Sequence, residues 1–74
     1  MPDFFFTFGF NSPGRGRFVR IRASDMASAR EEMFRVHGER WAFCYTEAEW
    51  RRPSGLTQQQ EYGLSELDFI NLEG

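Results

Sequence analysis

A single histidine and a single cysteine are the first candidates for chemistry in this chain. His37 has the side chain of a general base and Cys44 that of a nucleophile, but no third group is placed to orient such a pair. A zinc site needs about four ligands, which one Cys and one His do not approach. We interpret His37 as a helix C-terminal residue and Cys44 as a small buried strand residue. The sequence therefore predicts a protein that is not an enzyme and binds no metal or cofactor.

The segment Gly14-Arg15-Gly16-Arg17 offers backbone amides and cations, a combination that suits a phosphate. It follows Asn11-Ser12-Pro13, and turn formation explains the glycines more simply. The acidic residues of the second half are spread over loops and a strand rather than paired: Glu47, Glu49, Glu61, Glu66 and Asp68. We interpret them as solvated surface.

Aromatic residues are in excess, at 18% of the 74 residues, and every basic residue is an arginine. Along the first strand Phe4, Phe6, Phe8 and Phe10 share one face, and Phe5 lies on the other. A half-buried strand needs only one apolar face. The segment Trp41-Ala42-Phe43-Cys44-Tyr45 repeats this excess, and a single helix is available to cover one face of the sheet. We therefore expect the other face to lack an intramolecular cover.

We expect the helix to cover the face with Phe4, Phe6, Phe8, Val19, Ile21, Ala42, Cys44, Leu67 and Phe69. The opposite face then shows Phe5, Thr7, Phe18, Arg20, Arg22, Trp41, Phe43 and Tyr45. Aromatic and arginine side chains of this kind form protein interfaces, stack on single-stranded bases, or fold over the sheet as cover. Trp50-Arg51-Arg52 has the composition of an interface hot spot, with closure of the core by Trp50 as the alternative. The predicted partner-binding residues are Phe5, Phe18, Arg20, Arg22, Trp41, Phe43, Tyr45, Trp50, Arg51 and Arg52.

The elements that position these residues follow from periodicity and capping signals. Strands are predicted over 3–10, 17–23, 40–46 and 64–72, and a helix over 25–37. Capping boxes at 46–49 and 57–60 predict two single helical turns. The chain is thus one α+β domain, 1–74, in the order β-β-α-β-β, with one helix packed on one face of a single sheet.

This order resembles the β-grasp arrangement of ubiquitin-like domains. The resemblance implies that the first and last strands pair in parallel at the centre of the sheet. The alternative is a sheet in which the last two strands pair directly as a hairpin.

Several segments of the chain resemble small uncharacterised proteins encoded by bacteriophages. They are Phe6-Thr7-Phe8-Gly9, Arg17-Phe18-Val19-Arg20-Ile21 and Ala29-Arg30-Glu31-Glu32-Met33, with Trp41-Ala42-Phe43 and Tyr45. The resemblance implies an accessory protein of the host cytoplasm that binds and modulates a host or phage factor. The net charge of −2 argues against general affinity for nucleic acid. We expect a non-enzymatic protein-binding module that forms a homodimer and does not enter a membrane. The alternative is a single-stranded nucleic-acid binder.

Overall fold

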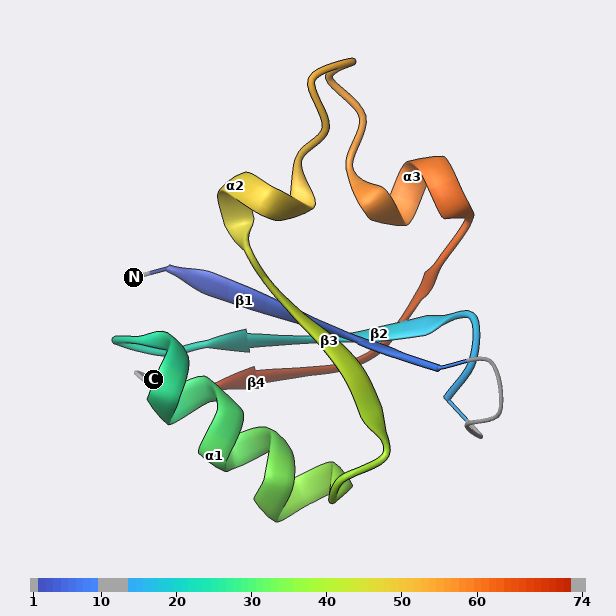
Figure 1. Cartoon of the computed structure of the whole chain (residues 1–74). Helices are drawn as coiled ribbons and strands as arrows, with labels where there is room; N and C mark the ends of the chain where they lie inside the picture. The colour runs from blue at the N-terminus through green and yellow to red at the C-terminus, as the bar shows by residue number, and fades with distance from the viewer. Residues whose placement is uncertain (1, 10–13, 73–74) are drawn as a thin grey trace.

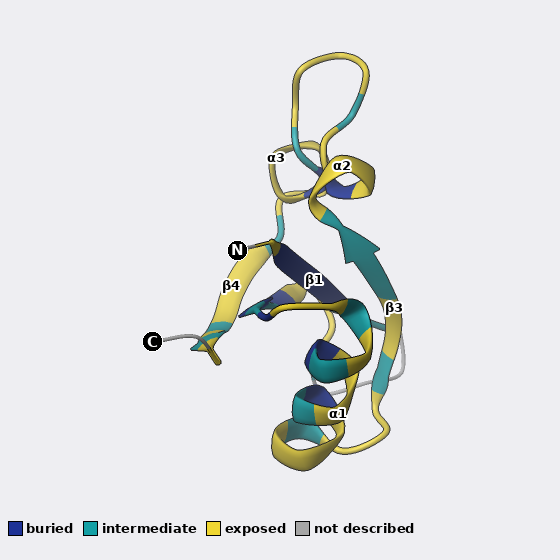
Figure 2. Cartoon of the chain, turned by 90° about the vertical axis from the view of Figure 1, so that its left-hand side faces the viewer, coloured by how far each residue is buried: buried dark blue, intermediate teal, exposed yellow. Residues whose placement is uncertain are grey.

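The computed structural model describes residues 2–9 and 14–72, and it shows one mixed four-stranded sheet between helices. α1 lies on one side of the sheet, and the short helices α2 and α3 lie on the other (Figures 1 and 2). The α+β class and the predicted positions of the strands and the helix are confirmed. Phe10 and the predicted turn residues Asn11, Ser12 and Pro13 lie outside the described residues. The elements are β1 (Asp3–Phe8), β2 (Arg17–Arg22), α1 (Met26–His37), β3 (Trp41–Thr46), α2 (Glu47–Trp50), α3 (Gln58–Tyr62) and β4 (Ser65–Asn71).

β1 and β2 are the central strands of the sheet, whose order is β3-β1-β2-β4. β1 pairs antiparallel with β2 and β3, and β4 runs parallel to β2. The predicted pairing of the first and last strands is therefore wrong, and so is the alternative hairpin of the last two. β1 is apolar on both faces and occupies the centre, whereas β4 carries Glu66 and Asp68 and lies at an edge.

α1 begins and ends at the residues that its sequence indicates. The Asp25 carboxylate accepts a hydrogen bond from the Ser28 amide at 2.7 Å, and Gly38 closes the helix at φ 70° with its amide donating to the Phe34 carbonyl. Ala29 and Met33 are fully buried against the sheet. Among the described residues, no helix is long and apolar enough to cross a membrane.

The face under α1, here called the first face, carries the main core. Phe6, Val19 and Ile21 are fully buried there with Met33. Phe8, Trp41, Cys44 and Ile70 pack around this cluster. The predicted placement of Phe4, Phe6, Phe8, Val19, Ile21 and Cys44 under the helix is thus confirmed.

Two β-bulges change which side chains complete this core. A register shift between Thr7 and Phe8 places Trp41 opposite Phe8, and its indole packs edge-on against Phe6 with centroids 5.1 Å apart. Trp41 therefore lies on the first face, which corrects the prediction. One extra residue in a strand reverses the faces of the residues beyond it.

The second register shift falls between the partners of Phe18 and Val19, where β4 carries the extra residue Leu67. It places Phe69 opposite Arg20, away from α1, and Ile70 opposite Ile21 in the main core. The prediction that Leu67 and Phe69 complete the first face is therefore wrong. Both residues remain more than one third exposed.

Candidate functional site

The face turned away from α1, here called the second face, has its own small core at its centre. Phe5 is 8% exposed, Phe18 2% and Trp50 3%. The Trp50 ring lies 4.6 Å from that of Phe5 and 5.1 Å from that of Phe18. The expectation of an uncovered aromatic face is therefore wrong here, and the alternative that Trp50 closes the core is confirmed. Because these three rings are buried within the chain, they are not available to a partner.

A short capped helix brings Trp50 onto the sheet. The Thr46 hydroxyl accepts a hydrogen bond from the Glu49 amide at 3.2 Å, and the Glu49 carboxylate accepts one from the Thr46 amide at 2.9 Å. This capping box starts α2 directly after β3 and ends the strand. Trp50 is the last residue of α2 and turns down onto Phe5.

Arg20 and Arg22 already have partners within the chain. The Arg22 Nε lies 2.8 Å from Asp3 Oδ1, and the Arg20 guanidinium lies 3.9 Å from Asp3 Oδ2 and 3.5 Å from Glu66. Both guanidinium groups also lie over the Phe69 ring, at 4.1 and 5.4 Å. The hydrogen bond and the charge of Asp3 raise the pKa of Arg22 above its ordinary value. These contacts weaken the prediction that the two arginines contact a partner.

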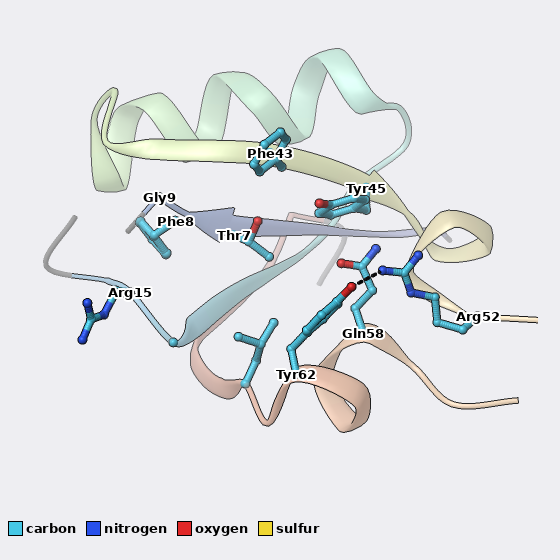
Figure 3. Close-up of a pocket in the computed structure, with 11 residues that line it drawn as sticks. Thr7, Phe8, Gly9, Arg15, Phe43, Tyr45, Arg52, Gln58 and Tyr62 are labelled. Carbon is cyan, nitrogen blue, oxygen red and sulfur yellow. Dashed lines mark hydrogen bonds between the residues drawn. The ribbon is translucent and has the colours of Figure 1, made fainter. Parts of the chain in front are cut away.

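Beside the small core of Phe5, Phe18 and Trp50, the second face carries a groove of about 520 Å³ (Figure 3). Its walls come from the end of β1, the turn that precedes β2, strand β3, the loop after α2, and α3 with the segment that follows it. Two of its rings are mostly exposed, Phe43 at 61% and Tyr62 at 60%. The lining residues are Thr7, Phe8, Gly9, Arg15, Gly16, Phe43, Tyr45, Arg52, Gln58, Tyr62 and Leu64. Below, this set is called the aromatic groove.

Contacts between α2, α3 and the loop that joins them hold one wall of the groove in place. The Arg52 Nη2 donates to the Tyr62 hydroxyl at 2.9 Å (Figure 3). Arg52 also pairs with Glu61 at 3.0 Å. Gln58 is 5% exposed and donates to the Glu49 carbonyl at 3.3 Å, which ties α3 to α2. A second capping box, between Thr57 and Gln60, starts α3 as predicted.

The charged residues of the lining are all cations. Arg15 and Arg52 are its only charged members, and no carboxylate lines the groove among the described residues. Arg15 is exposed and forms no ion pair within residues 2–9 and 14–72. Figure 3 shows Arg15 and Arg52 at opposite ends of the groove, with the aromatic rings between them. The site therefore suits an elongated ligand with an apolar middle and a negative charge.

The structure thus divides the predicted partner-binding residues among several places. Phe43, Tyr45 and Arg52 meet in the aromatic groove, whereas Trp41 is on the other face and Arg51 is exposed beside Glu47, 3.9 Å away. Tyr62 and Arg15 were not predicted as site residues. The only sequence signal for Tyr62 is the capping box at Thr57, which places it in a helical turn.

His37 and Cys44 each contact other groups of the chain. The His37 Nε2 lies 3.6 Å from Asp68, and Cys44 packs against the main core, where burial raises the pKa of its thiol to about 11. In the part of the chain that the structure describes, no three His, Cys, Asp or Glu side chains are grouped to hold a metal ion.

No protein-family model, curated protein or solved structure matches the chain.

Proposed function

We propose that this chain is a non-enzymatic binding module that holds a segment of a protein partner in the aromatic groove. The observation that carries the proposal is the exposure of the Phe43 and Tyr62 rings, each about 60%, on either side of one groove. Exposed aromatic side chains that share a concave surface are typical of interface anchors. Tyr45 and Leu64 also line the groove and are partly buried against the second-face core, so they add apolar surface.

The charges of the groove indicate which segments fit it. Arg15 attracts carboxylates, whereas Arg52 is already paired with Glu61 at 3.0 Å. Among the described residues no carboxylate lines the groove, so nothing in the lining repels an acidic ligand. The middle of the groove offers rings and aliphatic surface. The partner segment is therefore an extended peptide with aromatic or aliphatic side chains in its middle and acidic residues at the end that meets Arg15.

A single-stranded nucleic acid is the second candidate ligand. Arg15, which forms no ion pair with the described residues, lies at the end of a groove with stacking rings, and this position favours it. Against it stand the net charge of −2 and the internal pairing of Arg20 and Arg22 with Asp3. A protein segment needs fewer cations than a chain of phosphates, so we favour it.

The resemblance to small bacteriophage-encoded proteins supports a particular setting for this activity. In that setting the partner is a host or phage factor in the bacterial cytoplasm, which the protein modulates by occupying one of its segments. The β-grasp-like element order adds nothing to this argument, because the groove uses the connection between β3 and β4.

Fluorescence polarisation with two labelled peptides tests the proposal. The first peptide places Leu-Tyr-Leu between pairs of Glu, and the second replaces every Glu with Lys. We expect the acidic peptide to bind more tightly, by about tenfold or more. Arg15→Glu and Phe43→Ser weaken binding, whereas the matched controls Arg17→Glu and Leu56→Ser, both exposed and outside the groove, leave it unchanged.

Equal binding of the two peptides, or equal loss in the control variants, contradicts the proposal. A labelled single-stranded oligonucleotide in low salt serves as the comparison ligand. Tighter binding of the oligonucleotide that weakens steeply with salt and depends on Arg15 selects the nucleic-acid alternative.

A further inference from the structure

β3 is an edge strand that lacks the usual protection against pairing with another chain. It lies at the opposite side of the sheet from β4, and no described strand pairs with its outer edge (Figure 2). Its six residues, Trp41–Thr46, include neither a charged residue nor a proline. Its one irregularity is the bulge at its start, which leaves Phe43 to Thr46 in regular pairing with β1. Soluble proteins normally interrupt a free edge with a charge or a proline.

The other edge of the sheet shows the contrast. β4 carries Glu66 and Asp68 within Ser65–Asn71. If two copies of β4 met about a two-fold axis, these carboxylates would come close to their own copies, which is unfavourable. β3 has no such charge, so a second β3 meets no repulsion.

Apolar surface reaches the β3 edge from both faces of the sheet. On the second face Phe43 is 61% exposed. On the first face Phe34 of α1 is 46% exposed and packs against Trp41 with centroids 5.5 Å apart. A strand added at this edge would cover part of both rings, and the apolar area removed from water adds to the backbone hydrogen bonds.

We propose that β3 pairs antiparallel with β3 of a second copy of this chain, which joins the two sheets into one of eight strands about a two-fold axis. Facing residues in an antiparallel ladder point to the same side of the sheet. A register centred on Cys44 satisfies this rule, because it sets Phe43 of each copy opposite Tyr45 of the other on the second face. A register centred on Phe43 is excluded, because it sets Trp41 opposite Tyr45. Trp41 lies on the first face and Tyr45 on the second, so the two side chains would point to opposite sides of the sheet.

This dimer affects the aromatic groove without depending on it. Phe43 and Tyr45 line the groove, and the two-fold axis brings the grooves of both copies to the same side of the joined sheet. A partner with two acidic segments would then bind both grooves at once. The pairing itself uses the strand edge, so it holds whether or not the groove takes a peptide.

Sedimentation velocity over a dilution series measures the dimer, and Ala42→Lys tests its location. Ala42 is exposed at the start of β3, and a lysine there places a charge on the edge of each copy. We expect the wild-type chain to dimerise and Ala42→Lys to raise the dissociation constant by about tenfold or more. The control is Ala27→Lys, the same change at an exposed position of α1, which leaves the dissociation constant unchanged.

Hydrogen exchange of the unmodified chain gives an independent readout. In concentrated protein we expect slower exchange in β3 than in dilute protein, with no change in β4. A monomer at every concentration overturns the proposal. So does a dimer that Ala42→Lys leaves intact, or one in which concentration protects β4 rather than β3.

Discussion

The Trp50 indole lies nearly parallel to the Phe5 phenyl ring, with centroids 4.6 Å apart and 4° between the ring planes. Through this stack one helical turn closes the second face, because Phe18 and Tyr45 pack against the same indole. The stack joins residues 45 positions apart in the sequence, so it also fixes where the connection between β3 and β4 crosses the sheet.

We predict that Trp50→Ala destabilises the fold strongly. The change removes a 3% exposed side chain and leaves Phe5 and Phe18 beside a cavity. The expected loss in the free energy of unfolding is about 3–5 kcal/mol, measured by urea denaturation. Leu56→Ala, at a 46% exposed position of the neighbouring loop, is the control and costs less than about 1 kcal/mol. Equal losses for the two variants would show that Trp50 does not close a core.

We predict a smaller loss for Asp3→Asn. Asp3 is 8% exposed, and its carboxylate lies 2.8 Å from the Arg22 guanidinium and 3.9 Å from that of Arg20. Both arginine side chains are about one third exposed, so water screens much of the lost attraction. The expected cost is about 1 kcal/mol by urea denaturation. The lost stability comes from the contact between Asp3 and Arg22. We therefore expect the double variant Asp3→Asn with Arg22→Gln to lose little more free energy of unfolding than Asp3→Asn alone. Additive losses would contradict this coupling.

Local sequence signals predicted the elements well, because each signal acts over a few residues. Asp25 and Gly38 limit α1, and Thr46 with Glu49 starts α2, all through bonds between near neighbours. Alternation likewise assigned Phe4 and Phe6 to one face of β1. No distant contact is needed for any of these assignments.

The arrangement of the candidate site depends on contacts that local signals do not carry. Two bulges moved Trp41 and Phe69 to the faces opposite to those predicted, since a bulge is set by the pairing of two strands. The strand order could not be predicted from the element order alone. Tyr62 reaches the groove only because the chain crosses from β3 to β4 over the second face. Burial of Phe5 and Phe18 follows from the same crossing.

We predict that the stability of the fold decreases in acid partly through two capping carboxylates. Hydrogen bonds from the backbone and side chain of Ser28 lower the pKa of Asp25 below its ordinary value of 3.8, and those from Thr46 lower the pKa of Glu49 below 4.5. As the pH falls below these ordinary values, the unfolded chain takes up protons before the folded chain does, so the free energy of unfolding decreases.

Asp25→Asn isolates one of these groups. Asparagine also caps helices but does not titrate, so we expect near wild-type stability at neutral pH and a smaller decrease on acidification. Urea denaturation of both proteins from neutral pH down to about pH 3 measures the difference. Parallel curves for the two proteins would show that Asp25 does not contribute to the acid sensitivity.

We predict that Cys44 reacts slowly with thiol reagents in the folded protein. Burial against the main core raises the pKa of its thiol from 9.0 to about 11, so the reactive thiolate is about a hundredfold rarer near pH 8 than in an unfolded chain. Iodoacetamide labelling followed by mass spectrometry compares the folded protein with the protein in urea. We expect labelling of the folded protein to be slower by about this factor. The control is Trp50→Ala, which changes the other face of the sheet. Under conditions where this variant stays folded, we expect Cys44 to keep much of its protection. Rapid labelling of the native protein would show that Cys44 is open to solvent, and it would contradict the packing of β3 against α1 described above.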